Sequence, residues 1–86
     1  TRSLEKIVKW FANHRRIQLL ALLGDTPNLS VFEIAEETKV NFKTISDHLR
    51  RLVITGLVSE RNYGNMVRHK VSDLGQSILK FLRILE

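Results

Sequence analysis

The residues best suited to chemistry lie between positions 41 and 54, where apolar side chains recur at helical spacing. At about 100° per residue, one side of this helix carries Ile45, Leu49 and Leu52. The opposite side carries Lys43, Asp47, Arg50 and Ile54, flanked by Thr44 and Arg51. Lysine and arginine bind phosphate, and a carboxylate such as that of Asp47 can accept a hydrogen bond from a cytosine amine. This face is therefore suited to double-stranded DNA.

A second set of polar side chains follows in a predicted hairpin. Residues 57–61 and 66–71 are typical of strands, and the sequence Asn62-Tyr63-Gly64-Asn65 predicts the turn between them. Alternation in the second strand puts Arg68 and His69 on different faces, and we expect His69 to pack inward. Tyr63 is a candidate for contact with a sugar or a nucleic-acid backbone, because turns rarely need an aromatic residue.

Catalytic and metal chemistry lack the residues they need. The chain has no cysteine, which excludes disulfides, thiolate metal sites and cysteine nucleophiles. His14, His48 and His69 are scattered over three predicted elements, whereas a first-row metal needs three or four converging ligands. There is no glycine-rich phosphate loop, and Asp47 and His48 are adjacent on a helix, so their side chains diverge. We expect no enzymatic activity, no metal and no cofactor.

The charge balance points to an anionic partner. In 86 residues, 14 Lys and Arg stand against 9 Asp and Glu, for a net charge of +5. A basic surface attracts nucleic acid or an anionic membrane. No segment approaches the roughly 20 apolar residues of a membrane span, so a membrane role is limited to a peripheral one for the basic N-terminal helix. We expect a cytoplasmic, nucleoid-associated protein.

The N-terminal part of the chain is predicted to be helical. Residues 3–13 and 14–23 both have helical patterns. Either Asn13 caps a second helix, or one helix continues through it. Apolar residues surround the second segment on all sides, which predicts central burial, and Gly24 is expected to end it.

The remaining elements complete a recognisable order. Ser30 with Glu33 predicts a capping box before a helix over 31–38. A tight turn at 39–41 precedes a helix over 42–55, with Gly56 as its C-terminal cap. Asp73 with Gln76 predicts a second capping box before a last helix over 74–86. The expected fold is mostly α (α+β), a single domain over 1–86: a winged helix-turn-helix at about 31–55, with a two-stranded wing at about 57–72 and flanking N- and C-terminal helices.

The last helix is too apolar for one buried side. Its apolar residues cover roughly 160° of arc, whereas a one-sided surface helix needs somewhat more than about 100°. The surplus indicates a second partner, most simply another copy of the chain. The alternative is an apolar terminus left by truncation of a longer chain.

The stretch LSVFEIAEETKVNFKTISDHLRRLVITGLV carries a resemblance to a known family. The matching features are Ile34-Ala35-Glu36, Thr44-Ile45-Ser46, His48-Leu49, Leu52 and Gly56-Leu57-Val58. From about His14 to Leu74 the chain resembles the ArsR-like winged-helix repressors, and MarR-like regulators share much of the pattern.

The resemblance implies DNA contacts from residues 41–51 and the wing, and a dimer built from the terminal helices (about 3–13 and 74–86). The implied DNA-binding residues are Asn41, Lys43, Thr44, Ser46, Asp47, His48, Arg50, Arg51, Arg61, Asn62, Tyr63, Asn65 and Arg68. For His48, a half-buried packing role is an equal alternative to a phosphate contact. The expected dimer residues are Leu4, Ile7, Trp10, Phe11, Ile78, Phe81, Leu82 and Leu85. The resemblance also implies metal or redox sensing, but the ligands are missing.

Several positions depart from the family pattern. Lys39 stands where glycine is common, and a left-handed lysine costs about 1 kcal/mol. Phe42, Val53 and Ile54 replace polar residues of the recognition helix, and we expect extra packing around them.

These observations predict a sequence-specific transcriptional regulator that binds double-stranded DNA as a homodimer. The apolar Phe42, Val53 and Ile54 favour an alternative, a winged helix that binds another protein. The basic charge favours another alternative, a sequence-tolerant architectural DNA-binding protein.

Overall fold

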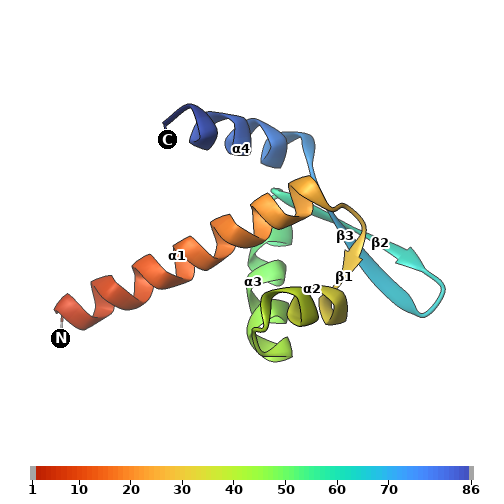
Figure 1. Ribbon diagram of the computed structural model, residues 1–86, viewed down its shortest axis with the longest axis horizontal. Coiled ribbons are helices and arrows are strands. Elements are labelled where there is room, and N and C mark those ends of the chain that lie inside the picture. Colours follow the sequence, from red (N-terminus) through yellow and green to blue (C-terminus); the bar gives the residue numbers. More distant parts are fainter. Residues whose placement is uncertain (1, 86) are drawn as a thin grey trace.

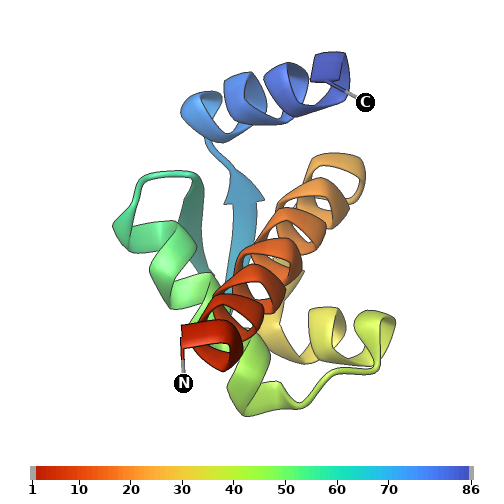
Figure 2. The same cartoon turned by 90° about the vertical axis from the view of Figure 1, so that its left-hand side faces the viewer.

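The computed structural model describes the backbone of residues 2–85 and the side chains of residues 5–6 and 13–84. The elements in order are α1 (Arg2–Asp25), β1 (Leu29–Ser30), α2 (Val31–Thr38), α3 (Phe42–Ile54), β2 (Val58–Tyr63), β3 (Met66–Val71) and α4 (Asp73–Leu85) (Figure 1). The predicted mostly α fold and its winged helix-turn-helix order are confirmed. The α2–α3 turn and α4 lie at opposite ends of the molecule (Figures 1 and 2).

Helix α1 is continuous, which settles the choice at Asn13. The Asn13 side chain accepts a hydrogen bond from the Arg16 guanidinium one turn later instead of capping a new helix. The central burial expected of this segment holds for Leu19, Leu20 and Leu23, whereas Ile17 stays exposed. The first half of α1 extends away from the other elements (Figure 1).

The sheet contains a strand that the sequence did not predict. The strand order is β1-β3-β2, and all pairs are antiparallel. The expected two-stranded wing is therefore corrected to a hairpin with β1 added at its base, where Leu29 pairs with His69. Strand β2 also continues through Tyr63, so the turn is shorter than expected. It is made by Gly64 and Asn65, with a φ of 62° at Gly64, the positive φ that tight hairpins require.

The core lies where α1, α2, α3 and α4 meet the sheet. The fully buried large side chains are Leu19, Leu23, Ile34, Ile45, Leu49 and Val58. Helix α4 adds Leu79, whose Cδ1 lies 2.9 Å from the position that a Cβ at Gly24 would take. Helices α1 and α4 therefore approach each other closely at Gly24.

Local hydrogen bonds fix the two helices of the helix-turn-helix. The Ser30 N–H donates to Glu33 Oε1 (3.0 Å) and the Glu33 N–H donates to Ser30 Oγ (3.2 Å), the predicted capping box. Lys39 takes the left-handed conformation expected of it, with φ 59°. The Asn41 side chain caps α3 by accepting from the Lys43 N–H at 2.8 Å.

The end of α3 has the hydrogen bonds of a Schellman motif. The Leu57 N–H donates to the Leu52 carbonyl and the Gly56 N–H to the Val53 carbonyl, both at 3.0 Å. Gly56 has a φ of 82°, which the motif requires at this position. The predicted glycine cap is confirmed, and it turns the chain directly into β2.

Helix α4 begins differently from the prediction. The cap is Ser72, whose Oγ accepts from the Gly75 N–H at 3.0 Å and donates to the Gly56 carbonyl at 2.5 Å. Ser72 is selected over Asp73 because its hydroxyl serves both the helix and the neighbouring chain. A Cβ at Gly75 would lie 2.2 Å from the Leu57 carbonyl oxygen, so α4 packs directly on backbone.

Candidate nucleic-acid interface

The outer face of α3 is polar and open, as the helical spacing predicts. All three residues of its apolar line are buried: Ile45, Leu49 and Leu52 are at most 3% exposed. The predicted contact residues that are exposed are Asn41, Lys43, Thr44, Asp47, Arg50 and Arg51. Ser46 and His48 are half-buried at the edges of this face. The core therefore holds α3 firmly while its donors and acceptors point outward.

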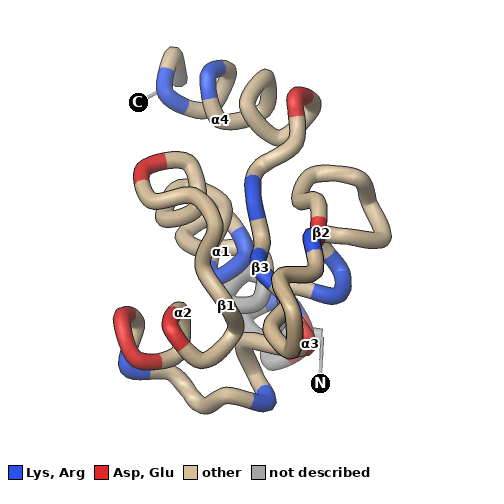
Figure 3. Tube along the Cα trace, turned by 90° about the vertical axis from the view of Figure 1, so that its right-hand side faces the viewer, with Lys and Arg blue, Asp and Glu red and all other residues tan. Residues whose placement is uncertain are grey.

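The tip of the wing carries the second exposed group. Arg61, Asn62, Tyr63 and Asn65 lie along β2 and in the turn, and all are exposed. The hairpin projects from the body on the side away from the first half of α1 (Figure 1). Acidic positions lie on α2 and basic positions lie on β2 and β3 (Figure 3), and one of each is paired, because Arg68 of β3 contacts Glu33 of α2 at 2.8 Å.

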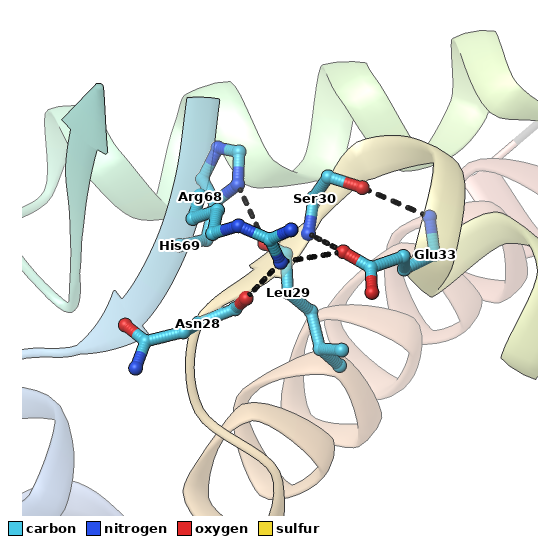
Figure 4. Close-up of polar contacts among 6 residues, drawn as sticks. All are labelled: Asn28, Leu29, Ser30, Glu33, Arg68 and His69. Carbon is cyan, nitrogen blue, oxygen red and sulfur yellow. Dashed lines mark hydrogen bonds and ion pairs between the residues drawn. The ribbon is translucent and has the colours of Figure 1, made fainter. Parts of the chain in front are cut away.

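Arg68 lies at the base of the wing and is bound within the chain. Its guanidinium donates to the Asn28 carbonyl at 2.7 Å and to Glu33 Oε1 at 2.8 Å (Figure 4). Hydrogen bonds from Ser30, followed by the charge of Arg68, hold the pKa of Glu33 below its ordinary value. Glu33 therefore both caps α2 and ties it to β3. The sequence shows only the first role, because 35 residues separate Glu33 from Arg68.

His69 packs on the inner face of the wing, as expected. It is 4% exposed, its Nδ1 lies 3.3 Å from the Leu29 carbonyl oxygen, and its Nε2 lies 3.8 Å from a Glu60 carboxylate oxygen. These contacts tie β3 to both of its neighbours. Among the side chains that the structure describes, no three His, Asp or Glu residues are grouped closely enough to hold a metal ion.

His48 lies between α3 and a group of arginines. Burial is the main cause that holds its pKa below the ordinary value. The positive charges of Arg16, Arg15 and Arg51 act in the same direction, and the Asp47 carboxylate opposes them. The α1–α3 seam is thus electropositive, a property that the sequence did not reveal because α1 and α3 come together only in the fold.

The predicted dimer surface is described in part. The side chains of Leu4, Ile7, Trp10, Phe11 and Leu85 lie outside the described set. On α4, Ile78 and Phe81 are exposed and Leu82 is half-buried. An apolar surface therefore remains uncovered on α4.

Extra packing was expected at Phe42, Val53 and Ile54, the three apolar residues of α3 at positions that are polar in the family, and it is found at one of them. Val53 packs against the core. Phe42 and Ile54 remain 55% and 76% exposed, so the expectation was wrong for these two positions within this chain.

The amino-acid sequence of the helix-turn-helix matches a known protein family. The family model described as "Bacterial regulatory protein, arsR family" matches residues 13–60, more than half of the chain. The chain belongs to the ArsR family. The matched segment extends from the middle of α1 into β2, so it contains the whole helix-turn-helix. The family consists of regulatory proteins, and the chain is therefore a regulator rather than an enzyme.

Solved structures agree with this assignment. The transcriptional regulator HlyU from Vibrio vulnificus CMCP6 is 30% identical, with a TM-score of 0.72 over 98% of this chain and 90% of that one. The winged helix-turn-helix domain of Mb0332 from Mycobacterium bovis, described as homodimeric and DNA-binding, is 28% identical, with a TM-score of 0.78 over 95% of this chain and 76% of that one.

A MarR-family protein shares the fold at lower identity. The oxidized form of MarR from E. coli is 21% identical, with a TM-score of 0.73 over 77% of this chain, and this chain covers 48% of the MarR chain. A sequence search of curated proteins finds no significant match. Within the described residues, no helix is both long and apolar enough to span a membrane.

Proposed function

We propose that this ArsR-family chain regulates transcription by binding a specific double-stranded DNA sequence as a homodimer. The observation that carries the proposal is the outer face of α3, where exposed polar residues stand on a fully buried apolar line. A helix of this kind fits the major groove, whose base edges present a distinct pattern for each base pair. We assign the activity to the cytoplasm, at the nucleoid.

The residues divide between recognition and positioning. Lys43, Thr44, Ser46 and Asp47 occupy the first half of α3, the part of a recognition helix that reaches base edges. Arg50 and Arg51, farther along, are assigned to phosphates. The remaining proposed contacts are Asn41 and His48 on α3 and Arg61, Asn62, Tyr63 and Asn65 on the wing. For Arg68, expected from the sequence to contact DNA, we propose the role of positioning the wing, because its guanidinium is bonded to Glu33 and Asn28.

The uncovered apolar side of α4 supports the homodimer. Phe81 and Ile84 are 58% and 73% exposed, and a two-fold axis would bury them against the same residues of a second copy. The DNA-binding domain of Mb0332 is described as a homodimer. In such a dimer the two α3 helices enter successive major grooves about 34 Å apart.

The test is a fluorescence-anisotropy titration of the chain with DNA across a salt series. One duplex is enriched by selection and the other has a random sequence. We expect at least a roughly 1,000-fold preference for the enriched duplex, with affinity that falls steeply as salt rises.

Three variants separate the roles of the α3 residues. Arg50→Ala should weaken both duplexes alike and reduce the magnitude of the salt slope by about 1. Asp47→Ala should relax the preference at one base pair by about 1–3 kcal/mol. Lys80→Ala removes a charge from exposed α4 at the other end of the molecule and should leave both affinities unchanged.

Two results would contradict the proposal. Salt-dependent binding without preference would indicate an architectural DNA-binding protein. The absence of binding at low salt would favour a second candidate, a protein-binding winged helix, which the exposed Phe42 and Ile54 support. Substitution of Phe42 by serine would then abolish partner binding, whereas Arg50→Ala would not.

A further inference from the structure

An apolar groove of about 630 Å³ opens between α1, the end of α3 and α4. Its walls include Ile17 and Leu20 from α1, Ile54 and Leu57 from the end of α3 and the loop after it, and Ile78 and Leu82 from α4. Ile17, Ile54 and Ile78 remain exposed, so the described side chains do not fill the groove. The volume is within the range of about 300–1,000 Å³ typical of small-molecule sites.

Two charged residues are described in the lining of the groove, and both are arginines. Arg16 from α1 and Arg51 from α3 line it, together with Asn13 and Thr55, and no carboxylate of the described residues does. The Arg16 guanidinium donates to the Asn13 side chain, which helps to fix it on α1. Among the described side chains, neither arginine has a carboxylate within 4.0 Å. The groove thus combines an apolar wall with two arginines that have no carboxylate partner in the part of the chain whose side chains are described.

A second copy is the alternative occupant, because Ile78 and Leu82 line the groove and are also among the residues expected at the dimer surface. Phe81 and Ile84 are exposed and do not line the groove. A dimer formed through these two residues leaves the groove open to a small ligand.

We propose that the groove binds an aliphatic monocarboxylate, with its carboxylate at Arg16 and Arg51 and its chain along the apolar wall. Guanidinium groups bind carboxylates through strong charge-assisted hydrogen bonds. Among the described side chains that line the groove none is aromatic, which fits a flexible aliphatic chain. The electropositive field at His48, to which both arginines contribute, supports an anion at this place. Binding of the acid does not rest on the proposed DNA function, because it is measured without DNA.

The test is isothermal titration of the full chain with three ligands that share a ten-carbon chain, with the two ionic ligands kept below their micelle concentrations and the alcohol below its solubility limit. Decanoate should saturate one site per chain. Decanol, which lacks the charge, should bind at least tenfold more weakly, and decyltrimethylammonium should not bind.

Two variants test the arginines and one serves as a matched control. Arg16→Gln and Arg51→Gln should each weaken decanoate about tenfold, the size of a typical charge-assisted hydrogen bond. Arg50→Gln changes the neighbouring arginine on the same helix, which does not line the groove, and should leave the affinity unchanged. Thermal unfolding checks that each variant is folded.

Three results would overturn the proposal. Equal binding of decanol and decanoate would show that only the apolar wall is used. An Arg50→Gln loss equal to the Arg51→Gln loss would show a diffuse charge effect. Failure of decanoate to bind a chain that sediments as a dimer would show that a second copy closes the groove.

Discussion

Helices α3 and α4 have the same length, 13 residues, and similar apolar content, but they bury it very differently. Helix α3 hides its whole apolar line against the core, with Leu49 only 1% exposed. Helix α4 hides Leu79 alone among its described large apolar side chains, while Phe81 and Ile84 stay open. Two helices with comparable sequence patterns therefore differ in how much of their apolar surface the chain buries.

This difference in burial shows which contacts cover the apolar side of each helix. Helix α3 is held by contacts within the chain, which keep its outer face in one orientation. Helix α4 is attached at Gly75 and Leu79 and leaves Phe81 and Ile84 exposed, which are the residues that the proposed dimer would bury. An amphipathic pattern predicts that one side of a helix is covered, but it does not identify the partner that covers it.

The largest effect is expected from Leu49→Ala in α3. The substitution leaves a cavity in the core, and the free energy of unfolding should fall by about 3 kcal/mol, measured by urea denaturation. Arg50→Ala, on the exposed face of the same turn, should change it by less than about 0.5 kcal/mol. Similar losses in the two variants would contradict the burial pattern of α3.

The second effect tests how α4 is attached. Gly75→Ala places a methyl group against the Leu57 carbonyl oxygen, which is backbone and cannot turn aside. We expect a loss of about 2 kcal/mol, because overpacking outweighs the gain in helix propensity. Gln76→Ala, at the next and exposed position, is the control. A Gly75→Ala chain as stable as the original would mean that α4 is not seated on Leu57.

The third effect separates chain stability from self-association. Phe81→Ser should leave the unfolding of the isolated chain within about 0.5 kcal/mol, because the side chain is exposed. It should weaken the dimer about tenfold, or about 1.4 kcal/mol, by sedimentation equilibrium. Leu79→Ala should do the reverse and destabilise the chain first. A dimer that tolerates Phe81→Ser would place the second copy elsewhere.

The smallest effect concerns His48 on α3. Its pKa is lowered in the folded chain, chiefly by burial and then by Arg16, so the unfolded chain binds the proton more readily. Stability should therefore fall as the pH drops from 7.5 through the ordinary histidine value near 6.5. His48→Gln should remove this part of the dependence, measured by thermal unfolding at pH 7.5 and 5.5. An unchanged slope would place His48 in a solvent-like environment.

Much of the fold followed from short-range patterns. The Ser30–Glu33 box, the left-handed Lys39 and the Gly56 cap are local devices that are complete within a few residues. The buried line of α3 followed from spacing alone. The electropositive α1–α3 seam and the groove could not be predicted, because the seam requires two helices and the groove three that are distant in sequence.

The sequence by itself determined the helices, the hairpin and the polar face of α3, because capping and periodicity act over one or two turns. The tertiary structure decided which distant segment covers each element. It selected Ser72 over Asp73 as a cap, paired Leu29 with His69 in an added strand, and joined Arg68 to Glu33. These contacts depend on packing between segments up to 40 residues apart, and a local sequence pattern does not indicate which distant segment will pack against it.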